Sequence, residues 1–272
     1  MELVTEQPSK YRHLEKMSIE EITASINHED QTVGLVVEKA LPQINLLIHS
    51  IVSKLKQAGR LFYLGSGSGG RLSVLDAIEM PTTYGISKGI INVILAGGID
   101  RLADALEEKE DDTEEGWAKL VENKISSLDI VIGISASGTT PFVLAALKKC
   151  REHGITTGCI VSNPSSPIAK QADFAVEVIT GPEFITGSTR MKCGTAQKMI
   201  LDIISTTAMI QLDRVEDNNM IHVQLINDKI TDRAVKMLMA KSGIKNYVEA
   251  KEILLKHGSV KKVLDSMKVK QL

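Results

Sequence analysis

Two short segments rich in glycine and hydroxyl residues constrain this chain most, because each lies between an apolar run and a helical pattern. The first, residues 65–70, reads Gly-Ser-Gly-Ser-Gly-Gly, and the second, residues 135–140, reads Ser-Ala-Ser-Gly-Thr-Thr. A strand that opens through small residues into a helix presents unpaired backbone N–H groups and a partial positive charge, and hydroxyls add donors. Each segment is therefore a candidate phosphate loop. If the two loops follow parallel strands of one sheet, they predict a single phosphorylated ligand that both loops hold.

Apolar runs alternate with helical patterns along the first two thirds of the chain. Runs of this kind, buried on both faces and joined by helices, favour a parallel sheet covered on both sides. The pattern predicts an α/β fold with a doubly wound, mostly parallel, five-stranded sheet. The expected strands are residues 60–64, 91–96, 130–134, 157–161 and 174–179. The expected helices begin near residues 71, 100, 141 and 167, and a long helix is expected at 191–212.

A helical arm is predicted before the first strand. Ser18 and Glu21 form a capping-box pattern, apolar residues then recur at helical spacing, and Gly59 offers a stop. After the long helix and a polar gap, the composition becomes helical again to the end, interrupted by Gly243 and Gly258.

The chain length and this tail together suggest two parts. At 272 residues the chain can bury one sizeable core with an appendage. We expect one α/β domain, which carries the two loops and the helical arm, at residues 1–219, and a small helical region of two or three helices at residues 220–272.

The composition argues against several classes of partner. The formal net charge is -2 and the isoelectric point is near 6.3, which does not suggest a nucleic-acid or polybasic membrane surface. The first residues lack a signal-peptide pattern, and no stretch approaches the length of a membrane span. The three cysteines, Cys150, Cys159 and Cys193, are scattered without metal-ligand spacing. We expect reduced thiols, no metal site and a cytoplasmic location.

A dinucleotide site is the first alternative to test, because Gly65, Gly67 and Gly70 match the G-x-G-x-x-G spacing. That site needs an acidic residue roughly 20 positions further on, to hold a ribose hydroxyl. The acidic residue near the end of the next strand is Asp100, well beyond that spacing. The second loop leads into Pro141, a favourable first helical residue, and suits a compact phosphate better.

The second loop, of the form Ser-x-Ser-Gly-x-Thr, resembles the sugar isomerase (SIS) domain family, which binds phosphosugars. Residues 181–198 and 75–85 are similar to a signature shared by N-acetylmuramic acid 6-phosphate etherases and glucokinase regulatory proteins. With Thr5-Glu6 and residues 26–30, the similarity covers nearly the whole chain.

The resemblance implies a cofactor-independent lyase of cell-wall amino-sugar recycling. Such an enzyme cleaves the D-lactyl ether of N-acetylmuramic acid 6-phosphate, giving N-acetylglucosamine 6-phosphate and D-lactate. The open-chain aldehyde acidifies the C2 proton, a base removes it, lactate leaves C3 with the help of an acid, and water adds back. A non-catalytic phosphosugar sensor and a phosphosugar isomerase remain the alternatives.

Two glutamates match the catalytic positions of that family. The resemblance favours Glu79 as the acid and Glu110 as the base. From the sequence alone, a surface carboxylate at a helix end is the more ordinary interpretation of Glu79. Glu110 lies in an acidic run, and such runs usually form a solvated face.

The expected ligand-binding residues are Ser66, Ser68, Ser135, Ser137 and Thr140 at the two loops, and Glu183, Ser188, Arg190 and Lys192 in the signature. A cation beside the signature can hold the phosphate, the lactyl carboxylate or a dimer contact. Many relatives carry Thr-Ser where this chain has Ser68-Gly69, so one hydroxyl contact passes to the backbone or is lost. A homodimer is expected from the resemblance.

Overall fold

The computed structural model describes residues 3–104 and 107–269 of the 272-residue chain. The chain divides into two compact units. The first consists of Met1–Ala77 and Gly89–Ile204, and the second of Ile78–Lys88 and Ser205–Leu272. Each unit is described separately below. The boundary between residues 219 and 220 that the sequence suggested remains our proposal.

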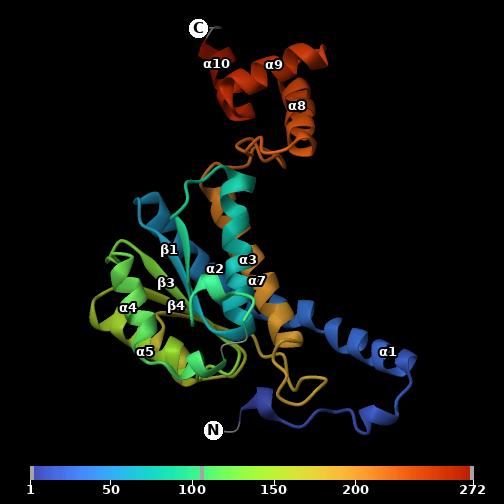
Figure 1. Cartoon of the computed structure of the whole chain (residues 1–272), viewed down its shortest axis with the longest axis vertical. Coiled ribbons are helices and arrows are strands. Elements are labelled where there is room, and N and C mark those ends of the chain that lie inside the picture. The colour runs from blue at the N-terminus through green and yellow to red at the C-terminus, as the bar shows by residue number, and fades with distance from the viewer. Residues whose placement is uncertain (1–2, 105–106, 270–272) are drawn as a thin grey trace. The chain divides into compact units, whose positions relative to one another are not determined.

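The first unit is built on a five-stranded parallel sheet, as predicted (Figure 1). The strand order is β2-β1-β3-β4-β5. The chain adds β2 on one side of β1 and the later strands on the other side, so the order of the strands reverses between β1 and β3. Ligands of such sheets bind at this point, outside the carboxyl ends of the strands. Each strand lies within two residues of its predicted bounds: β1 Leu61–Gly65, β2 Ile91–Leu95, β3 Ile130–Ser135, β4 Thr156–Val161 and β5 Phe174–Glu177.

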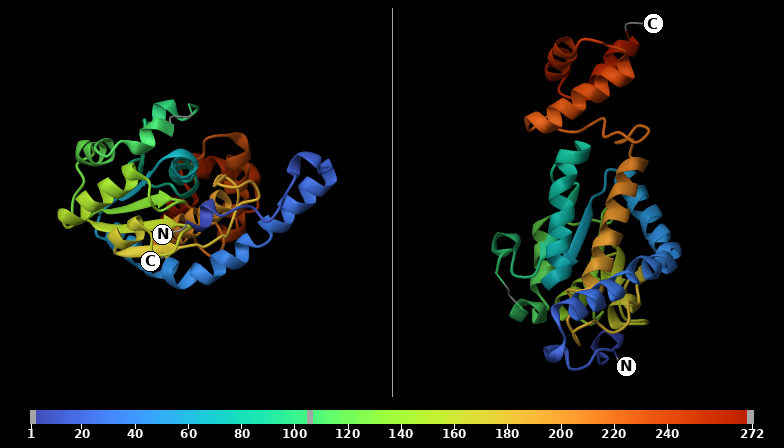
Figure 2. Two further views of the ribbon diagram at one scale, coloured as in Figure 1. Left: turned by 90° about the horizontal axis from the view of Figure 1, so that it is seen from below. Right: turned by 90° about the vertical axis from the view of Figure 1, so that its right-hand side faces the viewer.

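Helices cover both faces of this sheet (Figures 1 and 2). On one face α4 (Glu115–Glu122) and α5 (Pro141–Glu152) share a buried core with Phe62, Val131 and Cys159. On the other face Leu47 of α2 (Val33–Lys56) lies so close to Gly158 that a Cβ there would stand 2.6 Å from its Cδ1. Residues 158 and 159 point to opposite faces, because side chains alternate along a strand. The sheet is thus doubly wound, as predicted.

The N-terminal arm contains two helices instead of one. The capping box of Ser18 and Glu21 is confirmed at the start of α1 (Ile19–Asp30), which extends away from the sheet (Figure 2). The chain turns at residues 31 and 32 before α2 begins. After α2, the residue in the left-handed conformation is Ala58, with φ 61°. The prediction that Gly59 adopts this conformation and ends the helix was wrong. Gly59 is needed for a different reason, since a Cβ there would collide with the carbonyl of Leu128.

Two of the predicted helix starts are wrong. Among the described residues, no α-helix begins near residue 100. Instead, 3₁₀ turns at Ile99–Arg101 and Glu107–Asp111 lead to α4 at Glu115. Helix α3 (Gly67–Tyr84) begins inside the first glycine segment, four residues before the predicted start. The other two connections agree with the prediction, because α5 begins at Pro141 and α6 spans Pro167–Gln171.

The expectation that no segment approaches the length of a membrane span was wrong as regards length and composition. The helical stretch Ile19–Lys56 has a mean hydropathy of 1.3 over its most apolar window, long and apolar enough to cross a membrane. Of its 38 residues, 24 belong to α2, whose apolar face is buried in the core of the first unit. Core helices of this kind meet the same criteria, so length and composition do not make the stretch a membrane segment.

The second unit contains the predicted small helical region. Its helices α8 (Asp228–Ser242), α9 (Tyr247–His257) and α10 (Val260–Val269) enclose a core of their own. Gly243 and Gly258 end α8 and α9 in the left-handed conformation, with φ of 78° and 81°. Glycine adopts this geometry without the steric penalty of a Cβ, so the predicted interruptions are confirmed.

Candidate active site

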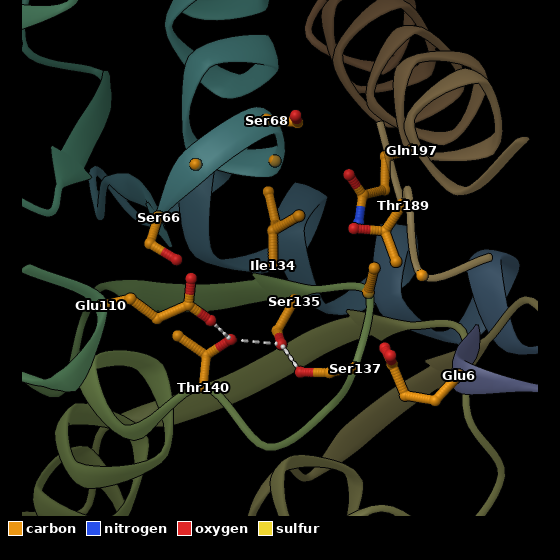
Figure 3. A pocket seen from close by; sticks show the side chains of 14 residues that line it. Glu6, Ser66, Ser68, Glu110, Ile134, Ser135, Ser137, Thr140, Thr189 and Gln197 are labelled. Carbon is orange, nitrogen blue, oxygen red and sulfur yellow. Dashed lines mark hydrogen bonds between the residues drawn. The ribbon is translucent and has the colours of Figure 1, made fainter. Parts of the chain in front are cut away.

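The two predicted phosphate loops line one pocket of about 250 Å³ (Figure 3). They come together because β1 and β3 are neighbours, with Gly65 opposite Ile134 in register. The lining residues are Glu6, Ser66, Gly67, Ser68, Gly69, Glu110, Ile134, Ser135, Ala136, Ser137, Thr140, Gly187, Thr189 and Gln197. Six of the predicted site residues therefore lie at this pocket: Ser66, Ser68, Glu110, Ser135, Ser137 and Thr140.

The second loop is held in shape by its own hydroxyls. The Ser135 hydroxyl accepts the Gly138 N–H at 3.0 Å, and the Ser137 hydroxyl accepts the Thr139 N–H at 3.2 Å. Gly138 has a φ of 71°, and a Cβ there would collide with Ser166. Ser137 Oγ also accepts the Thr139 hydroxyl at 3.0 Å and lies 3.3 Å from Ser135 Oγ, so the hydroxyls of the loop form one hydrogen-bonded cluster at the pocket.

A chain of hydroxyls connects this loop to Glu110. Thr140 donates its hydroxyl to Glu110 Oε1 at 2.8 Å, and Ser135 Oγ lies 2.7 Å from Thr140 Oγ1. Because the Thr140 proton is used by the carboxylate, the proton in the second bond comes from Ser135. Both hydroxyls are buried, so they fix the Glu110 carboxylate at the wall of the pocket (Figure 3).

The first loop contributes the N-terminus of α3. The first N–H groups of an α-helix have no partner within the helix and carry a partial positive charge. Gly67, Ser68 and Gly69 form this end of α3 and line the pocket. A Cβ at Gly69 would stand 2.8 Å from Ile134 Cγ2, which explains why this helix packs closely on β3. Gly69 itself offers only its backbone N–H as a donor, beside the hydroxyls of Ser66 and Ser68 at the same pocket.

The signature segment is anchored by a buried carboxylate. Glu183 accepts the backbone N–H groups of Lys192 and Cys193, both at 2.9 Å, at the start of α7 (Lys192–Gln211). A negative charge at a helix N-terminus is stabilising. Glu183 is 1% exposed and is not a lining residue, so its geometry supports a positioning role for the loop that carries Gly187 and Thr189.

Lys192 also lies outside the pocket, in a buried ion pair. Its Nζ lies 2.5 Å from Glu29 Oε2, and both side chains are almost fully buried. Tyr11 donates its hydroxyl to the other oxygen of Glu29 at 3.2 Å, and Lys10 lies 3.6 Å from it. Burial raises the pKa of Glu29, but the hydrogen bond and charge of Lys192, with Lys10 and Tyr11, outweigh burial and lower it. The pair fastens the N-terminal arm to the signature segment.

We expect Glu29→Gln to lower the free energy of unfolding by about 3–5 kcal/mol, because it leaves the Lys192 ammonium buried without its counter-charge. Urea denaturation measures the change. The matched control is Asp30→Asn, at an exposed neighbouring position. Adding Lys192→Met to Glu29→Gln should restore part of the loss. A cost below about 1 kcal/mol for Glu29→Gln would contradict this account.

The pH dependence of stability should have a definite sign. Because its folded pKa is lowered, Glu29 contributes stability that is present above its ordinary pKa of 4.5 and is lost as the pH falls through the folded value. In Glu29→Gln the loss of stability on acidification should therefore be smaller than in the original chain.

Arg190 lines a second, more open pocket of about 610 Å³ between α3 and α7. This cationic groove is lined by Ser68, Arg71, Leu72, Leu75, Arg190, Gly194, Thr195, Lys198 and Met199. Ser68 lines both pockets, so the groove continues the first pocket along α3. The described lining of the first pocket contains no lysine or arginine, whereas the groove has three such residues.

The remaining predicted residues lie elsewhere. Ser188 is half-buried between two lining residues but does not line the pocket itself. Glu79 is exposed on α3, about three turns or 16 Å along the helix axis from Ser68, and lines neither pocket. Within residues 3–104 and 107–269, no three histidine, cysteine or acidic side chains gather as metal ligands would.

Three polar lining residues were not among the predicted site residues: Glu6, Thr189 and Gln197. All three belong to the segments that carry the family resemblance, which was the available signal. Glu6 stands far from both loops in sequence, and nothing in its local pattern predicts that the arm returns to the sheet edge. Its position became apparent only from the folded chain (Figure 3).

Comparison with known proteins agrees with this fold. Residues 43–151 match the glucokinase regulatory protein N-terminal SIS domain, and residues 115–206 match the SIS domain. A phosphoheptose isomerase from Neisseria gonorrhoeae has a similar structure, with a TM-score of 0.55 at 16% identity. It covers 73% of this chain and all of its own. A phosphoheptose isomerase from Francisella tularensis gives a TM-score of 0.54 at 14% identity, with the same coverage of both chains.

Curated relatives are much more similar in sequence. An N-acetylmuramic acid 6-phosphate etherase from Bacteroides fragilis is 52% identical over 97% of this chain and 94% of its own length. The enzyme of that name from Porphyromonas gingivalis is 50% identical over 99% and 98%. A more distant one, from Geobacillus, is 42% identical over 95% and 88%. With half of its residues identical over nearly its full length, the chain belongs to the N-acetylmuramic acid 6-phosphate etherase family.

Proposed function

We propose that this protein cleaves the D-lactyl ether of N-acetylmuramic acid 6-phosphate, releasing D-lactate and N-acetylglucosamine 6-phosphate. One observation carries the proposal beyond family membership. Two helix N-termini with their hydroxyls, suited to a phosphate, share a pocket with Glu110, which Thr140 holds in place. A phosphosugar anchored at the loops would therefore present its ring to a fixed carboxylate.

The proposed reaction is an elimination followed by addition of water. In the open-chain aldehyde, Glu110 removes the C2 proton, the C3–O bond breaks, and the lactate oxygen takes a proton from an acid. Water then adds at C3 of the resulting unsaturated aldehyde. General acid–base groups must lie within hydrogen-bond reach of the reacting atoms, and a carboxylate fixed at the pocket wall meets this condition.

The lactyl carboxylate requires a cation that the first pocket does not offer among its described lining residues. The cationic groove begins at Ser68 and contains Arg190 and Lys198. Arginine binds carboxylates through two parallel hydrogen bonds, so we place the lactyl group toward Arg190. Phosphate at the loops and lactate in the groove would hold the substrate at both ends.

Ser137→Ala should weaken the binding of N-acetylglucosamine 6-phosphate by roughly ten- to a hundred-fold. The Ser137 hydroxyl lines the pocket, and a hydrogen bond to a charged group is worth about 1.5–3 kcal/mol. Titration calorimetry measures the change. The control is Ser126→Ala, the same substitution outside the pocket, which should leave the affinity unchanged. Unchanged affinity would show that the second loop does not bind the phosphate.

The proposed activity is tested by incubating purified protein with N-acetylmuramic acid 6-phosphate and assaying D-lactate. Release of D-lactate supports the etherase. Binding without turnover would favour the phosphosugar sensor, and turnover of an aldose phosphate to its ketose, without D-lactate, would favour the isomerase. No observation in the structure favours either alternative.

We further propose that the enzyme works as a homodimer whose two sites are completed across the interface. Glu79 lies on α3 beyond the reach of a sugar held at Ser68 of its own chain, so α3 of a second copy is the candidate source of the acid. Leu75 and Ile78, on the same helix, are 44% and 63% exposed, which supports a partner surface there.

We propose the cytoplasm as the site of action. Cys150, Cys159 and Cys193 are all buried and free. Burial raises the pKa of each thiol to about 12, which makes them unreactive. Unpaired cysteines are typical of proteins in a reducing compartment.

A further inference from the structure

The N-terminal arm places a second carboxylate at the pocket, on Glu6. Figure 3 shows Glu6 beside Ser137, on the other side of the hydroxyl cluster from Glu110. The hydrogen bond that its carboxylate accepts from the described residues is a weak one, from the Thr5 hydroxyl at 3.5 Å. A carboxylate offers about four lone-pair positions, so most of the accepting capacity of Glu6 is open to a ligand.

The position of Glu6 is fixed by its neighbour. Thr5 is fully buried, and its N–H donates to Asn163 Oδ1 at 3.2 Å, while Asn163 Nδ2 donates to the Thr5 hydroxyl at 2.9 Å. The same amide nitrogen donates to the carbonyls of Ala136 and Ser137. Asn163 thus ties the arm directly to the second phosphate loop, and Glu6 follows the tied residue.

Charge determines which part of a sugar phosphate Glu6 can face. A carboxylate repels the phosphate and the lactyl carboxylate, so it cannot serve as a site for either anion. The neutral donors of the sugar are its hydroxyls and the acetamide N–H. A carboxylate accepts hydrogen bonds from hydroxyls more strongly than a neutral acceptor does.

We propose that Glu6 is a specificity-determining residue that accepts a hydrogen bond from a hydroxyl of the sugar, and that Thr5 and Asn163 position it. This inference rests on the proposed binding of a phosphosugar at the two loops. Repulsion from Glu6 directs the anionic ends of the substrate to the helix N-termini and the cationic groove. The sugar is thereby held in one orientation against Glu110.

Two ligands with opposite responses test the proposal. In Glu6→Gln, the affinity for N-acetylglucosamine 6-phosphate should fall about tenfold or more, because a charged acceptor is lost. The affinity for inorganic phosphate should stay equal or rise, because a nearby negative charge is removed. The matched control is Glu15→Gln, on the same arm and outside the pocket, which should change neither affinity.

A deoxy series identifies the hydroxyl. The 1,5-anhydro, 3-deoxy and 4-deoxy forms of N-acetylglucosamine 6-phosphate each lack one donor. One of them should bind Glu6→Gln and the original chain equally well, because the contact is already absent. A parallel loss of affinity for both ligands in Glu6→Gln, no loss for either, or an equal penalty for all three analogues would overturn the proposal. Release of D-lactate by the original chain tests the proposed function separately.

Discussion

Glu110→Gln should lower kcat for D-lactate release by about 10²–10⁴-fold, the range typical of a lost general base. Glutamine has nearly the same size, and its carbonyl can still accept the Thr140 hydroxyl that now donates to Glu110 at 2.8 Å. The second loop should therefore keep its shape. We expect the affinity for N-acetylglucosamine 6-phosphate to change little, so that the loss appears in turnover and not in binding.

Glu108→Gln is the matched control, because Glu108 lies in the same 3₁₀ turn but is exposed and outside the pocket. It should retain full activity. If Glu110→Gln also retains full activity, Glu110 is not the base. If product affinity falls as far as turnover, the side chain acts through the shape of the loop instead of through proton transfer.

The role of Glu110 can be separated from that of Glu79 in deuterated water. A variant that lacks the base should fail to exchange the C2 proton of N-acetylglucosamine 6-phosphate, whereas one that lacks only the acid should still exchange it. We expect no exchange in Glu110→Gln and exchange in Glu79→Gln. The opposite pattern would reverse the two assignments.

The sequence predicted the sheet well because each strand is a short apolar run bounded by turn residues. It predicted the connection after β2 poorly. No periodic apolar face runs through residues 99–111, and the chain forms two 3₁₀ turns there before α4 begins at Glu115. The start of α3 was misplaced because glycine is a weak helix former. At Gly69 and Gly70 its small size is used for close packing on β1 and β3.

The sequence likewise predicted only those parts of the site that depend on local order. Residues beside a strand end, such as Ser135 and Ser137, lie at the pocket because local order places them there. The positions of Glu6 and of the pair formed by Lys192 and Glu29 depend on the arm folding back over the sheet edge. Such contacts join residues more than 150 positions apart, and no local pattern encodes them.

The position of Glu79 leads to the last prediction. Glu79→Gln and Glu110→Gln should each be nearly inactive alone, yet a mixture of the two, unfolded and refolded together, should recover about a quarter of the original activity. In a two-fold dimer each subunit gives its α3 to the site of the other. A mixed dimer then has one site with both glutamates intact and one with neither. Random pairing makes about half of the dimers mixed, and half of their sites active.

The control is Glu110→Gln mixed in the same way with the double variant Glu79→Gln, Glu110→Gln, where no pairing produces a complete site. This mixture should stay inactive. Size-exclusion chromatography with light scattering verifies that dimers re-form in both mixtures. If the first mixture forms dimers and remains as inactive as its components, Glu79 does not act across an interface. The exposed side chains of Leu75 and Ile78 on α3 would then need an explanation other than a shared active site.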